Sequence, residues 1–451
     1  MAANKGVGMS DNWLSMPATA LGFGIGSGDI DPVVLTRVFL DAIDRHPMSD
    51  RIYARVTADR ALAEATAAKS RAEAGQRLSV LDGVPVSWKD LFDTAGVATE
   101  AGSRVLKGRV PEKDAAVLAR ATSLGLVCLG KTHMSELAFS GLGHNPMTAT
   151  SPGFHDHRTV AGGSSSGAAA SVAFGLAAAA VGSDTGGSVR IPAGWNDLVG
   201  LKTTIGRLSV AGTVPLCPSF DTVGPLCRNV ADCAAMLAML GGTPVVDLTN
   251  STLDGAKFLV LETVVQQDID DSVAKSFSDA LELLVSHGAT IERAEVPVVA
   301  EAYDCGAVLF VAEAYAVWGQ QVETRQDEMF TQIAQRILLG KSVAAHEYIN
   351  GMACLSRAKD RYQIATRGYD AVVMPTSPIL PPNVEKLQTD PAYYQQANLM
   401  ALRNTRLANL LGLCALTIPT NVPGAGFMMV GPPNSEERLL RLGAAAERAL
   451  A

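Results

Sequence analysis

Hydrophobic and polar positions follow each other along the chain in patterns typical of alternating helices and strands. Apolar residues recur at helical spacing between residues 34 and 43, after the polar and proline-containing start at 27–32, and predict a helix there. A second helix is expected at 57–75, with Thr57 as its N-cap. The apolar run 84–89 then predicts a short buried strand that ends in a lysine.

The same alternation continues to the C-terminus. Further helices are expected at 115–124, 229–240 and 271–287, through most of 301–363, and at 434–451. Further strands are expected at 126–131, 199–202, 207–209, 258–261, 290–292, 371–374 and 415–418. The segments between 258 and 292 form a βαβ unit. This pattern favours a layered α/β fold with a mostly buried sheet.

No internal repeat or low-complexity linker divides the 451 residues, so one large domain is expected despite the length. Residues 1–26, rich in Gly, Ser and Met, are expected to form an N-terminal arm that packs on the body or stays mobile. The domain itself is expected to cover 27–451.

Two serine clusters and one lysine carry the candidate chemistry. The clusters, GGSSSG at 162–167 and DTGGSVR at 184–190, are joined by an Ala-rich segment that predicts a helix at 168–180. Ser164 and Ser188 are 24 positions apart (188 − 164), and Lys89 stands upstream in GVPVSWKD. A Gly/Ser-rich stretch alone usually indicates a loop, and a lone lysine usually lies at the surface; the argument for chemistry depends on all three motifs occurring in this order.

Together these motifs resemble the amidase signature family, whose members cleave amide bonds with a Ser, cis-Ser and Lys triad. The resemblance spans about 29–450 and is sharp in a signature core at about 83–225. It implies the amidase signature fold, an α/β domain with a central mixed β-sheet flanked by helices. It also implies that neither a metal nor an organic cofactor is needed, because the triad supplies every proton transfer.

The chemistry of amide hydrolysis then gives each residue a role. Ser188 is the expected nucleophile, Lys89 the base, and Ser164, joined to Gly163 by a cis peptide bond in the family pattern, the proton relay between them. Lys89 can act only when neutral, so its pKa must lie well below the usual value. The expected oxyanion hole consists of the backbone N–H groups of Thr185, Gly186, Gly187 and Ser188. Side chains expected to hold this loop in register are Ser165, Asp184 and Arg190.

The resemblance also indicates the walls of the substrate pocket. The candidate wall residues are Phe139, Ser140, Gly141, Leu142 and Ile379. They predict a roomy apolar pocket without a fixed charge, which fits aryl or alkyl amides, anilides, esters and carbamates, although Phe139 and Leu142 could equally be ordinary core residues. A small-molecule amide or carbamate is therefore the expected partner, and the family suggests a homodimer.

Three rival interpretations remain open. GSSSG at 163–167 matches the nucleophile elbow G-x-S-x-G around Ser165, but the preceding residues 151–158 look like a loop rather than a strand. The family also includes the glutamine-hydrolysing amidase component of tRNA-dependent amidotransferases, which hands ammonia to a partner protein. His155 and His157 could suggest a metal site, but two histidines without further ligands more often lie in a polar loop.

Composition narrows the class further. A net charge of −8 without a cluster of Lys and Arg argues against nucleic acid as a partner. The longest apolar run, 172–181, is too short for a membrane span, and the first ten residues lack a secretion signal, so a cytoplasmic protein is expected. The seven scattered cysteines are expected to be reduced core residues.

Overall fold

The computed structural model describes residues 12–451, and all of its strands belong to one mixed sheet. The strands are β1 (Tyr53–Val56), β2 (Pro85–Lys89), β3 (Val127–Thr132), β4 (Ala179–Ser183), β5 (Val199–Lys202), β6 (Val223–Cys227), β7 (Lys257–Leu261), β8 (Thr290–Ala294), β9 (Ala371–Pro375), β10 (Cys414–Pro419) and β11 (Gly426–Gly431). They lie in the order β1-β3-β2-β4-β6-β5-β10-β11-β9-β7-β8. The expected central mixed sheet is thereby confirmed.

Parallel pairing is confined to two parts of the sheet. Strand β2 pairs in parallel with β3 and β4, and β7 pairs in parallel with β8 and β9. All other neighbours are antiparallel. The parallel trio of β3, β2 and β4 matters for function, because the carboxyl ends of β2 and β4 meet at the same edge of the sheet.

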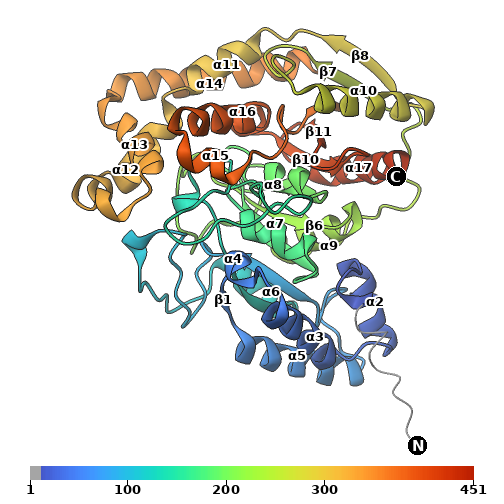
Figure 1. The fold of residues 1–451 in the computed structure, drawn as a ribbon. Helices are drawn as coiled ribbons and strands as arrows, with labels where there is room; N and C mark the ends of the chain where they lie inside the picture. Colours follow the sequence, from blue (N-terminus) through green and yellow to red (C-terminus); the bar gives the residue numbers. More distant parts are fainter. Residues whose placement is uncertain (1–11) are drawn as a thin grey trace, which may run out of the picture.

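Helices cover both faces of this sheet (Figure 1). They are α2 (Ala18–Ser27), α3 (Pro32–Arg45), α4 (Ser49–Ile52), α5 (Ala58–Glu73), α6 (Ala116–Ser123), α7 (Ser166–Ala173), α8 (Arg190–Trp195), α9 (Val230–Gly241), α10 (Asp271–Ser286), α11 (Val298–Gly306), α12 (Leu309–Thr324), α13 (Thr331–Leu338), α14 (Ala345–Ala365), α15 (Val384–Thr389), α16 (Pro391–Leu410) and α17 (Glu436–Leu450). Within residues 12–451, no helix combines the length and apolar character needed to cross a bilayer.

Alternate residues of the strands face different helices. On β6, Leu226 packs with α7 and α8, whereas Cys227 belongs to the main core with α9. On β2, Trp88 lies in the main core, whereas the hydroxyl of Ser87 lies 2.7 Å from that of Ser171 on α7. Lys89, two positions after Ser87, lies on the same side of the strand as α7. The sheet therefore buries the lysine beneath the segment that carries the first serine cluster.

Most predicted elements are present, and polar caps explain several helix starts. The Asp31 side chain caps α3 by accepting hydrogen bonds from two backbone N–H groups, and the Asn229 side chain caps α9 by accepting one, from the N–H of Asp232. The prediction of a strand at 207–209 is wrong, because these residues lie at the end of a turn and in the irregular segment that follows it. The strand β11 and the long helix α16 were not predicted.

The Ala-rich segment between the serine clusters also differs from expectation. The predicted helix 168–180 ends at Ala173, residues 174–178 form a turn, and only the last two residues, 179–180, belong to the central strand β4. Gly175 adopts a φ of 72° and donates its N–H to the carbonyl of Val172, which ends the helix. Alanine is small enough to be buried in either element, so the composition of this segment does not distinguish them.

The expected N-terminal arm is only partly within the described residues. Residues 1–11 lie outside them. The remainder includes α2, where the backbone N–H groups of Ala18 and Thr19 both donate to Asp232 on α9 at 2.8 Å. This part of the arm packs on the body of the protein.

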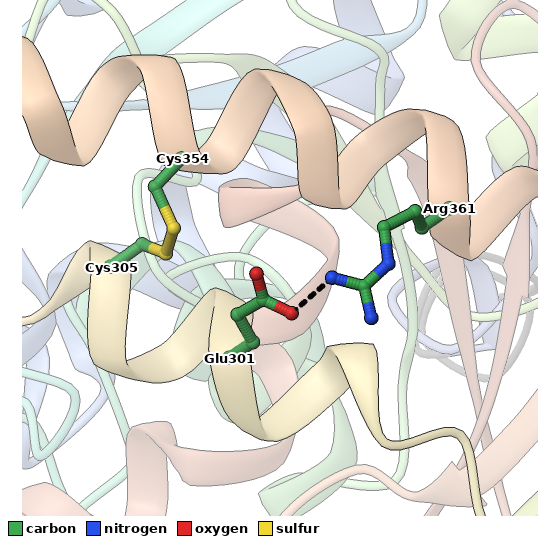
Figure 2. Close-up of a disulfide and its surroundings, with 4 residues drawn as sticks. All are labelled: Glu301, Cys305, Cys354 and Arg361. Carbon is green, nitrogen blue, oxygen red and sulfur yellow. Dashed lines mark hydrogen bonds and ion pairs between the residues drawn. A yellow bond between two sulfur atoms is a disulfide. The ribbon is translucent and has the colours of Figure 1, made fainter.

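The prediction that every cysteine is reduced is wrong for one pair. A disulfide joins Cys305 on α11 to Cys354 on α14, with a Cα–Cα distance of 6.0 Å. Figure 2 shows this bond beside an ion pair between Glu301 and Arg361, which links the same two helices. The other five cysteines within the described residues are free and buried.

Candidate active site

The buried lysine at the end of β2 is the centre of the site. Lys89 is fully buried, and its Nζ donates to Ser164 Oγ at 2.6 Å and to Ser183 Oγ at 2.8 Å. Burial lowers the pKa of Lys89 to about 7, against the opposing effect of the Asp184 and Asp221 carboxylates. A substantial fraction of this lysine is therefore neutral near pH 7 and able to accept a proton.

The first serine cluster lies against the loop that follows β3. The peptide bond between Gly163 and Ser164 is cis, as the family resemblance implies. The N–H of Gly163 donates to the carbonyl of Gly141 at 2.8 Å, and the carbonyl of Ser164 accepts from the N–H of Ser135 at 3.1 Å. A Cβ atom at Gly163 would lie 2.5 Å from the backbone nitrogen of Gly143, so only glycine allows this close approach.

The second serine cluster is held by a buried ionic network. Asp184 Oδ1 accepts two hydrogen bonds, one from the N–H of Gly187 at 2.8 Å and one from the guanidinium of Arg190 at 2.9 Å. Burial would raise the pKa of Asp184, but Arg190, Lys202 and Asn409 hold it well below its usual range. Arg190 also donates to Asn409 at 2.7 Å. The carboxylate therefore remains charged and fixes the loop that precedes Ser188.

This network changes the expected oxyanion hole. The N–H of Gly187 is already taken by Asp184. The N–H groups of Thr185, Gly186 and Ser188 have no acceptor among residues 12–451. These three donors are available to an oxyanion, and the fourth serves to shape the loop.

Ser188 lies next to the first cluster and opens onto a pocket. Its carbonyl accepts a hydrogen bond from the N–H of Ser165 at 3.2 Å, which joins the two serine clusters through their backbones. Its side chain faces a pocket and has no hydrogen-bond partner among residues 12–451. The structure thus connects Lys89 with Ser164 directly and joins Ser188 to the first serine cluster through the backbone of Ser165.

The rival assignment of Ser165 as nucleophile does not fit this arrangement. Ser165 is fully buried, and its hydroxyl donates to the carbonyl of Ser183 at 3.2 Å. No strand leads directly into it, as a nucleophile elbow requires. His155 forms a pair with Asp197 at 2.6 Å, and no cluster of three or more metal-ligating side chains occurs within the described part of the chain.

The pocket in front of Ser188 contains only some of the predicted wall residues. It is lined by Ala138, Phe139, Ser140, Thr185, Gly186, Leu216, Phe310, Arg336, Leu402 and Arg406. Leu142 and Ile379 instead pack in a separate hydrophobic cluster around Trp195, and Gly141 donates its N–H to Asn398. The prediction of a pocket without fixed charge is wrong, because two arginines line it.

Several residues around the site had no recognisable sequence signal. Thr405 and Asn409 lie on α16, which packs beside α8 although the two are far apart in sequence (Figure 1). Asp221 accepts a hydrogen bond from the Thr185 hydroxyl at 2.5 Å and from the backbone N–H groups of residues 216–217. It thereby connects these residues to the glycine loop, which we define as residues 184–188. Ser183, which accepts a hydrogen bond from Lys89, directly precedes the second serine cluster at 184–190. It is therefore the one residue of this group that the sequence motifs could have indicated.

Gly187→Ala is expected to damage the site, because a Cβ atom there would lie 2.1 Å from Thr405 Oγ1 and the residue has a φ of 138°. Thr405 is fully buried and cannot move away. We expect a destabilisation of about 1–3 kcal/mol and a loss of activity of at least about tenfold. Gly186→Ala is the matched control, because its added Cβ would meet only Leu402, at 3.6 Å. Urea unfolding and steady-state rates of both variants would test this; equal effects would contradict it.

Comparisons with known proteins agree with this geometry. Residues 34–440 match the Amidase family model. The chain is 36% identical over 384 residues to a 2-amino-5-chloromuconic acid deaminase of Comamonas testosteroni, covering 82% of each chain. It is 32% identical over 440 residues to a glutamyl-tRNA(Gln) amidotransferase subunit of Anaeromyxobacter sp. (strain K), covering 88% of this chain and 89% of the other. The solved peptide amidase of Stenotrophomonas maltophilia has a TM-score of 0.80 at 26% identity, covering 96% of this chain and 97% of that one. The chain therefore belongs to the amidase signature family and is an amide C–N hydrolase.

Proposed function

We propose that the chain is a serine hydrolase that cleaves small-molecule amides through an acyl-enzyme on Ser188. The observation that carries this proposal is the contact of a buried Lys89, with a pKa of about 7, with Ser164 beside the Ser188 loop. A neutral lysine hydrogen-bonded to one serine can draw a proton from a second serine through it.

The reaction then proceeds in two steps, acylation of Ser188 and hydrolysis of the resulting ester. Ser188 Oγ attacks the amide carbonyl while its proton passes through Ser164 to Lys89, and the oxyanion is bound by the N–H groups of Thr185, Gly186 and Ser188. The C–N bond breaks as the same proton returns to the leaving nitrogen, which departs as an amine. Water then attacks the ester by the same relay and releases the acid.

The same machinery would accept anilides, carbamates and esters. A carbamate carbonyl presents the same geometry to the nucleophile and to the oxyanion donors, so the substrate is selected by the pocket rather than by the triad. Initial rates of p-nitroaniline release from p-nitroacetanilide and from an alkyl N-(p-nitrophenyl)carbamate would give the amide-to-carbamate preference directly.

A test independent of the substrate uses a fluorophosphonate, which reacts with activated serines. We expect one adduct per chain, located at Ser188 by peptide mass spectrometry. Lys89→Met should slow its formation, because the serine loses its base. An adduct at Ser165, or labelling that is unaffected by Lys89→Met, would contradict the proposed mechanism.

The relatives that are components of amidotransferases support a second candidate function. In this alternative, the chain would be the glutamine-hydrolysing component of a complex and would need a partner for full activity. Turnover of a simple amide by the purified chain alone would favour the free-standing enzyme. Fluorophosphonate labelling at Ser188 without any turnover would favour the amidotransferase component.

A further inference from the structure

Two arginines share the pocket with the proposed nucleophile. Arg336 comes from α13 and Arg406 from α16, and both are partly buried. They line the same pocket as Ser188, together with the apolar side chains of Phe139, Leu216, Phe310 and Leu402. A charged group in such a setting usually has a partner of opposite charge.

Neither arginine has such a partner within residues 12–451. Arg336 donates to the carbonyl of Phe139 at 2.9 Å, and its guanidinium lies 4.1 Å from the centre of the Phe139 ring. Arg406 lies 5.8 Å from the centre of the Phe310 ring. No carboxylate lies within 4.0 Å of either guanidinium among these residues. Arg190, at the start of α8, differs from these two arginines because its guanidinium forms an ion pair with Asp184.

The carboxylates of the neighbouring segments are engaged elsewhere. Asp221 accepts from the Thr185 hydroxyl and from two backbone N–H groups. Glu313 accepts from the Tyr348 hydroxyl and from the N–H of Ser219. Burial, followed by repulsion from the charge of Arg406, lowers the pKa of Arg336 to about 10. An anion between them would relieve this repulsion.

The position of the pocket indicates which part of a substrate it receives. A second pocket adjoins the first, sharing Thr185 with it, and is lined by Ser183, a hydrogen-bond partner of Lys89, and by Asp221. The leaving nitrogen must receive its proton from the Lys89 relay, and we therefore assign the leaving group to the pocket lined by Ser183, which contacts Lys89. The pocket with the arginines is left for the acyl group.

We propose that the substrate is an amide whose acyl group ends in a carboxylate, and that Arg336 and Arg406 bind this carboxylate while Ser188 attacks the amide carbonyl. Guanidinium groups suit this task, because their planar donors match the two oxygens of a carboxylate. The apolar side chains that line the same pocket suit the carbon chain of such an acyl group, as in the monoamide of a small dicarboxylic acid. This inference depends on the proposed function, because it uses Ser188 as the nucleophile.

The test compares two anilides that differ only in this charge. Succinyl p-nitroanilide carries the carboxylate, and butyryl p-nitroanilide has a neutral acyl chain of equal length. For the wild type we expect kcat/KM to be at least about tenfold higher for the acid. Arg336→Gln and Arg406→Gln should each remove most of this preference, largely through KM, and change the rate for the neutral anilide by less than about threefold. Arg336→Lys should retain part of the preference.

Controls separate this proposal from the function on which it depends. Arg357→Gln removes a positive charge from the exposed side of α14 and should leave both rates unchanged. If neither anilide is cleaved, a protection experiment tests the carboxylate proposal instead. Succinamate should slow the labelling of Ser188 by the fluorophosphonate in the wild type, and butyramide should not. Equal cleavage of both anilides, or equal protection by both amides, overturns the carboxylate proposal and leaves the hydrolase intact. Failure of Ser188 to react with the fluorophosphonate overturns both.

Discussion

Replacing Ser188 with alanine is expected to reduce amide hydrolysis by about ten-thousandfold or more, because the chain then lacks the atom that forms the acyl-enzyme. The side chain faces the pocket and is not part of the hydrogen-bond network that supports the loop. Its removal should therefore leave the fold intact. Initial rates with a p-nitroanilide, together with a thermal melting curve, would measure both effects.

Ser165→Ala is the matched control, because Ser165 lies in the other serine cluster and is also buried. Its hydroxyl makes one hydrogen bond, to the carbonyl of Ser183. Losing this bond is expected to cost about 1 kcal/mol of stability and less than about tenfold in rate. If Ser165→Ala were inactive and Ser188→Ala active, the nucleophile would be Ser165 and the rival elbow interpretation would be correct.

The candidate triad could be predicted from the sequence because its three residues lie in short, recognisable motifs. Lys89, Ser164 and Ser188 stand in three segments of a few residues each, and two of these segments are rich in glycine for physical reasons. Gly163 allows a close approach to Gly143, and Gly187 adopts a φ that favours glycine. Both requirements leave a glycine directly before a catalytic candidate, and this pairing is readable in a single sequence.

The pocket could not be predicted in the same way, because its walls come from segments that meet only in the folded chain. Arg336 and Arg406 are contributed by α13 and α16, far from the serine clusters in sequence. An arginine on a helix is usually solvated, and nothing near either residue in sequence indicates a pocket. The expectation of an uncharged pocket failed for this reason.

The fold also shows where secondary structure could not be predicted from the local sequence. The segment 168–180 is Ala-rich, and alanine favours a helix, but the helix ends at Ala173 and the central strand β4 begins at Ala179. This strand is buried between β2 and β6, where small side chains allow α7 to pack closely on the sheet. Tertiary packing overrides the propensity of the segment here.

The pH dependence of the reaction is expected to reveal Lys89. Because its pKa is about 7, kcat/KM should fall about tenfold for each pH unit below about pH 6.5 and level off above about pH 8. Lys89→Met should lower the rate by at least about a hundredfold and remove this acidic limb, because no base of that pKa remains. Lys202→Met is the matched control: it also removes a fully buried lysine, but one that donates to the carbonyls of Thr203 and Leu413 rather than to a serine. Lys202 also helps to keep Asp184 charged, so the rate of this variant is expected to fall, but its pH profile should retain the acidic limb of the wild type. An acidic limb that persists unchanged in Lys89→Met would mean that another group is the base.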